Sequence, residues 1–307
     1  IIFLSIILFI NKEGVKINNF NKEGNNIMNI LFVDTETTGL KPEKSFILTN
    51  GSILYNSESK KYDEFYEVLN WDMLLSNFNI PEDTIKVHGI TKDIMHDEGI
   101  NPITSMSNYY KWIYKFCKDS TSGKLDVVVA FNLSYDLNMF ISNLKFLSEK
   151  FCSGNFETIT SERNNLNYLL DLFSKEYIYG NLSPNDPNAN KPLFIDSLFI
   201  DRIFNFEVDG EKVYHDLQTV GERYNIPVDP DAHNAIADTR RTFKVFLIQM
   251  DELQNKYNVQ IDQKLESRLI RGYKRNQDYW KKGKDALDYL ANNMNAVTGG
   301  IIKNGVE

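Results

Sequence analysis

The stretch Asn29-Ile-Leu-Phe-Val-Asp-Thr-Glu-Thr-Thr-Gly39 indicates the fold more clearly than any other part of the sequence. It opens with a short apolar run and ends in polar residues, which is the pattern of a buried strand whose end reaches solvent. Side chains two positions apart on a strand point to the same face, so Asp34 and Glu36 should project together while Thr35 faces away. Two carboxylates this close repel each other unless a cation lies between them. A solvated turn is the commoner origin of such a pair, but the buried strand ahead of it favours a cation site.

A second acidic residue group follows another apolar run, at residues 127–131. The run leads into Asn132-Leu-Ser-Tyr-Asp136, and a helix is expected over 134–147. Asp136 would then lie in the first turn of that helix, with Ser134 as its N-cap. Taken alone, Asp136 would be a stabilising acid at a helix N-terminus.

The third group is His233-Asn-Ala-Ile-Ala-Asp238, at the start of a helix expected over 235–250. At about 100° per residue, five positions on an unbroken helix separate two side chains by about 140°. His233 and Asp238 can therefore converge only if His233 lies in the loop before the helix. Pro227 and Pro230 favour such a loop.

The remaining pattern predicts a sheet with helices on its faces, because strands come first and then alternate with helices. The segment 153–192 is polar and rich in turn residues, and is expected to be an insertion with one helix near 166–173. Further strands are expected at 46–55, 62–69 and 193–195, and further helices at 102–116 and 217–224.

Composition narrows the chemistry. The two cysteines, Cys117 and Cys152, have no zinc-ligand spacing, which favours a reducing cytoplasm over a disulfide framework. A net charge of −8 argues against coating duplex DNA by phosphate neutralisation alone. Carboxylates gathered at the ends of core elements, without Cys or neighbouring His, suit hard cations such as Mg²⁺ or Mn²⁺.

The three groups, in this order, resemble the exonuclease motifs of the DnaQ-like DEDDh 3′→5′ exonuclease superfamily, which includes the proofreading epsilon-like subunits. Residues 87–91, Val-His-Gly-Ile-Thr, match a stretch common in the polymerase-linked members. Asp196-Ser-Leu198, Leu217-x-x-Val220 and Tyr224-Asn-Ile226 match the segment ahead of the third motif. The resemblance covers an exonuclease domain at 28–250 and implies an α/β ribonuclease H-like fold, with a five-stranded mixed sheet flanked by helices.

The resemblance also implies the roles of individual residues. Two Mg²⁺ or Mn²⁺ ions would be held by four carboxylates, those of Asp34, Glu36, Asp136 and Asp238, with His233 as the general base. The residues expected at the substrate are Thr35, Thr37, Leu40, His88 and Asn132.

The implied function is release of nucleoside monophosphates from single-stranded DNA 3′ ends, with proofreading in DNA replication and a DNA polymerase as partner. The enzyme is expected in the cytoplasm of a bacterium, or of a bacterial host if phage-encoded, with no membrane partner. One alternative is an RNA-trimming 3′→5′ exoribonuclease. Another is a catalytically silent nucleic-acid-binding module, although such a module has no need to keep all five motif residues.

The two ends of the chain fall outside the resemblance. Residues 1–27 are expected to be translated upstream sequence or a disordered leader before a start at Met28, because Lys22-Glu-Gly24 can be encoded by bases that resemble a ribosome-binding sequence. Their apolar run, 1–10, has half the ~20 residues of a membrane span, so a short membrane-associating leader is the alternative.

Residues 251–307 are expected to form a basic helical tail. Its basic residues lie at positions 268, 271, 274, 275, 281, 282 and 284, interleaved with Tyr273, Tyr279 and Trp280. Such a pattern suits single-stranded nucleic acid, and equally suits a terminal helix that packs its aromatics on the domain.

Overall fold

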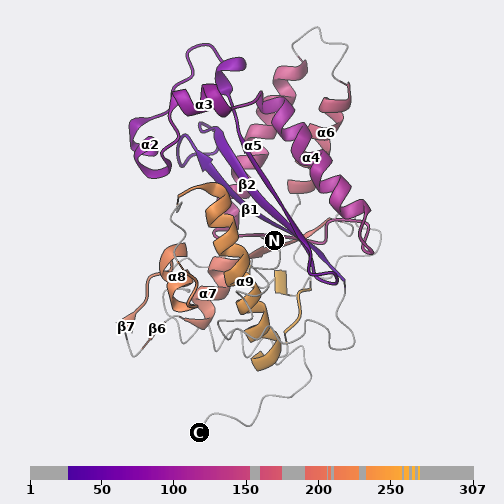
Figure 1. Cartoon of the computed structure of the whole chain (residues 1–307), viewed down its shortest axis with the longest axis vertical. Helices are drawn as coiled ribbons and strands as arrows, with labels where there is room; N and C mark the ends of the chain where they lie inside the picture. Colours follow the sequence, from indigo (N-terminus) through magenta and orange to yellow (C-terminus); the bar gives the residue numbers. More distant parts are fainter. Residues whose placement is uncertain are drawn as a thin grey trace, which may run out of the picture.

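A five-stranded mixed sheet forms the centre of the molecule (Figure 1), in the order β3-β2-β1-β4-β5. The computed structural model describes residues 27–152, 160–174, 191–205, 207–208, 211–227, 233–257, 259–262, 265–266 and 269. The strands of the sheet are β1 (Asn29–Thr37), β2 (Ile47–Asn56), β3 (Tyr62–Val68), β4 (Val127–Ala130) and β5 (Leu193–Asp196). A separate two-stranded sheet pairs β6 (Glu207–Val208) with β7 (Glu211–Lys212).

The predicted first strand is the central strand. β1 pairs antiparallel with β2 and parallel with β4, while β4 pairs parallel with β5. The four residues of β4 are all buried, as expected for a parallel strand covered on both faces. The register of β1 against β2 shifts between Glu36 and Thr37, and such a bulge bends the strand where its acidic side chains lie.

Helices cover both faces of the sheet, as predicted. Their bounds are α2 (Glu82–His88), α3 (Lys92–Glu98), α4 (Pro102–Lys118), α5 (Leu133–Cys152), α6 (Thr160–Phe173), α7 (Ser197–Phe204), α8 (Leu217–Arg223) and α9 (Ala235–Tyr257), with a short 3-10 helix, η1, at Trp71–Met73. Alternation along β1 gives each face its own core. Leu31 and Val33 pack with α4, α5 and α6, whereas Ile30 and Phe32 pack with α7 and α9.

The fold differs from the predicted elements in three places. α2 and α3 have seven residues each, too few to show a helical period in the sequence. α7 follows β5 without a loop, because the side chain of Asp196 caps it by accepting from the Leu198 N–H at 3.0 Å. α5 begins at Leu133, so Ser134 lies inside the helix and is not the predicted N-cap.

The predicted helix of the 153–192 segment is present and longer than expected, because α6 starts at Thr160. No helix in the described part of the chain is both long and apolar enough to cross a membrane. The expected leader lies outside the described residues up to 26, and the basic tail lies outside them from 270 onward.

Candidate active site

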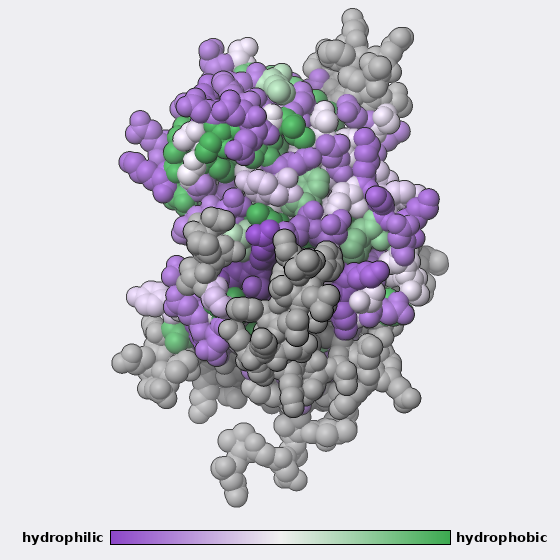
Figure 2. Space-filling model, viewed as in Figure 1, coloured by the Kyte–Doolittle hydropathy of each residue, from purple (hydrophilic) through white to green (hydrophobic). Residues whose placement is uncertain are grey.

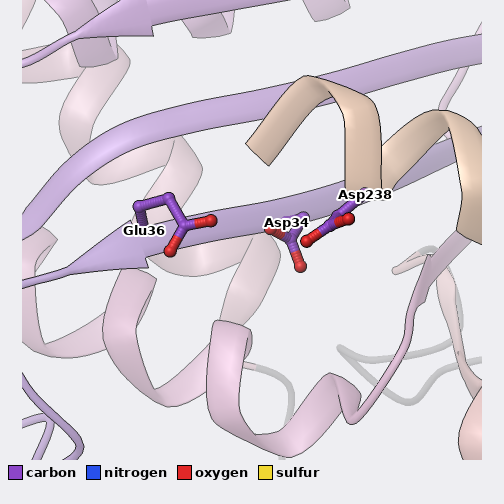
Figure 3. A group of neighbouring side chains, drawn as sticks. All are labelled: Asp34, Glu36 and Asp238. Carbon is purple, nitrogen blue, oxygen red and sulfur yellow. The ribbon is translucent and has the colours of Figure 1, made fainter. Parts of the chain in front are cut away.

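Asp34 and Glu36 lie near the end of β1 and point to the same face of the sheet, as their spacing predicts. Figure 3 shows their carboxylates turned toward that of Asp238, which comes from α9. One ligating oxygen from each of the three residues lies within 4.8 Å of the other two, and all three side chains are half-buried. The first and third motifs, at opposite ends of the domain's sequence, therefore meet at one point.

The start of α9 brings Asp238 to this point. Asn234 caps the helix by accepting from the Ile236 N–H at 3.1 Å, so the helix begins after His233. The helix then lies directly on β2 at Gly51, the residue that pairs with Asp34 in the sheet. A Cβ on Gly51 would lie 2.3 Å from the Ala235 carbonyl carbon, so only glycine allows this approach. Thr239 fixes the contact by donating its hydroxyl to the Gly51 carbonyl at 2.9 Å.

Asp136 reaches the site from α5 and is almost fully buried, with 2% of its surface exposed. Its carboxylate accepts a hydrogen bond from the Thr35 hydroxyl at 2.8 Å. Asp136 therefore stands beside the group of three rather than within it. Burial raises the pKa of Asp136 to about 7, and the hydrogen bond from Thr35 opposes that rise.

The carboxylates of the site strongly disfavour one another's charge. The pKa of Asp34 lies well above its ordinary value, because of burial and then because of the charges of Asp136, Glu36 and Asp238. Burial, with the charges of Asp238 and Asp136, raises the pKa of Glu36 to about 8. Oxygen-only donors with this much mutual repulsion fit divalent cations such as Mg²⁺ or Mn²⁺.

His233 lies in the turn before α9, where its spacing from Asp238 requires it to be. Its φ of 67° is left-handed, a conformation that is uncommon for residues other than glycine although histidine adopts it more often than most. The side chain is exposed. Strained backbone of this kind persists where the surroundings fix it and is concentrated at functional sites.

The residues expected at the substrate fall into two groups. The hydroxyls of Thr35 and Thr37 are buried and bound to protein groups, Asp136 and Tyr135 respectively, which leaves neither side chain free for a nucleotide. Leu40, by contrast, is 84% exposed, and Asn132 is also exposed, with a left-handed φ of 72°.

His88, at the end of α2, lies beside the site. Its Nδ1 accepts from the Ile90 N–H at 3.0 Å. Burial lowers the pKa of His88, while an interaction with the backbone of Thr37 opposes that shift. Figure 2 shows hydrophobic surface over the nearby α2–α3 region, where Val87 is 59% exposed.

Asp196 is a supporting residue whose role the sequence did not reveal. Its buried carboxylate accepts the N–H groups of Asn132 and Leu133, each at 3.1 Å, and so holds the start of α5. Burial raises its pKa to about 7, against these hydrogen bonds. The match of Asp196-Ser-Leu198 to the family segment was a signal for it, but the spacing alone does not say what the carboxylate binds.

Comparisons with known proteins agree with this geometry. The chain matches no protein-family profile. The 3'-5' DNA exonuclease Cap18 of Escherichia coli is 26% identical over 104 residues, which are 34% of this chain and 50% of that protein. The match thus spans half the length of that relative.

Among solved structures, the nuclease domain of 3'hExo, a DEDDh family member bound to rAMP, is 14% identical with a TM-score of 0.50, covering 77% of this chain and 96% of that one. Exonuclease I of E. coli in complex with a dT13 oligonucleotide is 15% identical with a TM-score of 0.45, covering 75% of this chain and 42% of that one. The chain thus has a ribonuclease H-like fold, and its resemblance to the DEDDh 3′→5′ exonucleases is confirmed.

Proposed function

We propose that the chain is a metal-dependent 3′→5′ exonuclease that releases nucleoside monophosphates from the ends of single-stranded DNA. The observation that carries the proposal is the convergence of Asp34, Glu36 and Asp238 within 4.8 Å, with Asp136 beside them. These are the positions of the metal-binding carboxylates in the motifs that the sequence resembles. A silent binding module would gain nothing from such repulsion, so an enzyme is the better reading.

Asp34 is the central ligand in this proposal, because the charges of the other three carboxylates all raise its pKa. Glu36 and Asp238 would hold one cation with Asp34, and Asp136 would hold a second cation with it. Two divalent cations supply the positive charge that phosphodiester hydrolysis needs at the attacking and leaving oxygens. Thr35 orients Asp136 for this task by its 2.8 Å hydrogen bond.

His233 is proposed to accept the proton of the attacking water. An exposed imidazole on a fixed turn next to Asp238 can exchange that proton with solvent after each cycle. Histidine suits this step because it ionises near neutral pH. Leu40 and Asn132, both exposed, are proposed to contact the terminal nucleotide.

The preference for DNA rests on the relative from E. coli, which is named as a DNA exonuclease. RNA trimming is the second candidate, because the 3'hExo domain was solved with rAMP, a ribonucleotide. A protein distinguishes the two sugars by contacts to the 2′-hydroxyl.

The physiological role that we infer is proofreading beside a DNA polymerase in the cytoplasm of a bacterium or a phage-infected bacterium. The support is the match of residues 87–91 to the polymerase-linked members. The buried free thiol of Cys117 is compatible with a reducing compartment. Preferential removal of a mismatched over a matched primer end, measured with and without a replicative polymerase, tests this role.

The activity is tested with single-stranded DNA and RNA of one sequence, labelled at the 5′ end and incubated with Mg²⁺, Mn²⁺ or EDTA. We expect a ladder shortened one nucleotide at a time from the 3′ end, only with a divalent cation, and faster on DNA. A 3′-phosphorothioate end should delay it. Asp238→Asn serves as the matched inactive variant, because it keeps the side-chain shape and removes the charge. Cutting by that variant, or internal cutting by the wild type, contradicts the proposal.

A further inference from the structure

The residue ahead of Asp136 in α5, Tyr135, makes contacts that none of the motifs explains. Its hydroxyl lies 2.6 Å from the Thr37 hydroxyl and 3.2 Å from the Gly39 carbonyl oxygen. The Thr37 hydroxyl also lies 2.9 Å from that carbonyl. Two hydroxyls carry two hydrogens between them, so the consistent arrangement is Tyr135 donating to Thr37, which donates to Gly39. A side chain of α5 thereby holds the turn at the end of β1.

The group is sheltered from water. Thr37 is 6% exposed, and Tyr135 is half-buried. Burial raises the pKa of Tyr135, and the charges of Asp136, Glu36 and Asp34 raise it further while its hydrogen bond to Thr37 opposes them. The phenol therefore stays protonated and able to donate, and it lies close enough to the carboxylates to sense their charge.

The same helix holds the other end of the loop. Asn143 accepts the Ile47 N–H at 3.1 Å and donates to the Ser45 carbonyl at 3.1 Å. Between these two anchors the chain presents Leu40, whose side chain is 84% exposed. α5 thus carries Asp136 and also fixes both ends of the loop that carries Leu40.

We propose that the Tyr135 hydroxyl is a positioning group, which locks the turn at residues 37–39 and sets Leu40 at a fixed distance from the carboxylates. It touches neither metal nor substrate. Its effect is on how tightly the strand end is held, and the chemistry at the carboxylates does not depend on it. This effect on the strand end rests on the proposed function, whereas the locking of the turn does not.

The test is Tyr135→Phe, which removes one oxygen and keeps the ring. The first readout needs no activity. Lys44 is exposed, and trypsin should cut after it faster once the turn is released, while Lys41 is protected by the following proline. The second readout is kinetic. KM for a single-stranded oligothymidylate should rise about threefold to tenfold, as expected for one lost hydrogen bond, with kcat changed by less than about twofold.

The matched control is Tyr109→Phe. It also removes a buried phenol oxygen with a hydroxyl partner, that of Ser52 at 2.9 Å, but it lies in α4 and holds no part of the loop. Tyr109→Phe should lower the melting temperature without changing tryptic cutting at Lys44 or KM. An equal effect of both variants would mean that Tyr135 only adds general stability, and would overturn the proposal.

Thr37→Val separates the proposal from direct substrate binding by Thr37. If Thr37 acts as the link between Tyr135 and Gly39, Tyr135→Phe should add little to Thr37→Val, because the two variants break one connected set of bonds. Independent, multiplicative effects on KM would assign Thr37 to the substrate and contradict the proposal.

A wild-type protein that neither cuts nor binds any strand would overturn the proposed function and the KM part of this inference together. The tryptic readout still decides whether the hydroxyl locks the turn. Unchanged cutting at Lys44 in Tyr135→Phe overturns that part on its own.

Discussion

Glu36 carries the clearest consequence of burying several carboxylates in one place. Its pKa is about 8 in the folded protein, against an ordinary value of 4.5. Between these values the folded state keeps a proton that the unfolded state has lost, so stability falls as pH rises. The stabilisation is complete below the unfolded pKa and is lost as pH rises through the folded one.

We therefore expect the melting temperature in EDTA to fall between about pH 5 and about pH 8, and saturating Mg²⁺ to reverse that slope. Glu36→Gln should flatten the dependence in EDTA. Thermal unfolding followed by circular dichroism at several pH values measures it. A melting temperature in EDTA that stays level or rises over this range would contradict the inferred burial of charge.

His233 is expected to act on proton transfer and not on metal binding. His233→Ala should lower kcat by about 10²–10⁴-fold, the usual contribution of a general base, and leave Mg²⁺ affinity nearly unchanged. The rise in rate through the pH range where histidines ionise should disappear, when measured at saturating Mg²⁺. Loss of Mg²⁺ affinity in step with rate would instead make His233 a ligand.

At the scale of the elements, the site depends on how closely α9 lies on β2. Gly51→Ala would put a methyl group 2.3 Å from the backbone of Ala235, and backbone cannot move aside as a flexible side chain can. We expect a loss of about 1–3 kcal/mol in the free energy of unfolding, as for other overpacked sites. Because the start of α9 must shift, Mg²⁺ affinity and activity should fall as well.

Gly221→Ala is the matched control for this prediction. Its added methyl group would meet the Arg241 side chain, with Nε at 2.8 Å, and that side chain can move. The control should cost less stability and keep Mg²⁺ affinity, as measured by calorimetric titration. Normal Mg²⁺ binding by Gly51→Ala would show that the close approach does not set the position of Asp238.

The elements that the sequence predicted are those whose burial is recorded in periodic side chains. β1 and β4 are apolar runs, and the start of α9 is marked by Asn234 and by prolines ahead of it. α2 and α3 were missed because each is only two turns long. The support that Asp196 and Tyr135 give to α5 was also missed, since hydrogen bonds between distant segments leave no period in the sequence. The sequence thus predicted the acidic residues better than the groups that orient them.

At the scale of the whole molecule, charge should decide how long strands are held. The chain has a net charge of −8, yet seven basic residues lie between positions 268 and 284. Neutralising Arg271, Lys274, Arg275, Lys281 and Lys282 to Gln should weaken binding of long single strands and flatten its salt dependence, because fewer counterions are released.

Cleavage of a dinucleotide should barely change in that variant, since so short a substrate reaches only the carboxylates. Fluorescence anisotropy with labelled oligonucleotides at several salt concentrations measures the effect. Unaltered affinity for long strands at low salt would assign the segment a structural role.

The contact between Gly51 and Thr239, 188 residues apart in the sequence, has a consequence for the life of the protein in the cell. A ribosome delivers β1 early, but Asp238 emerges only when most of the domain has been synthesised. Until α9 docks on β2, the nascent chain holds an incomplete set of metal ligands. A nuclease assembled in this order is harmless to the messenger that encodes it while translation is under way, and its activity reports that folding has finished.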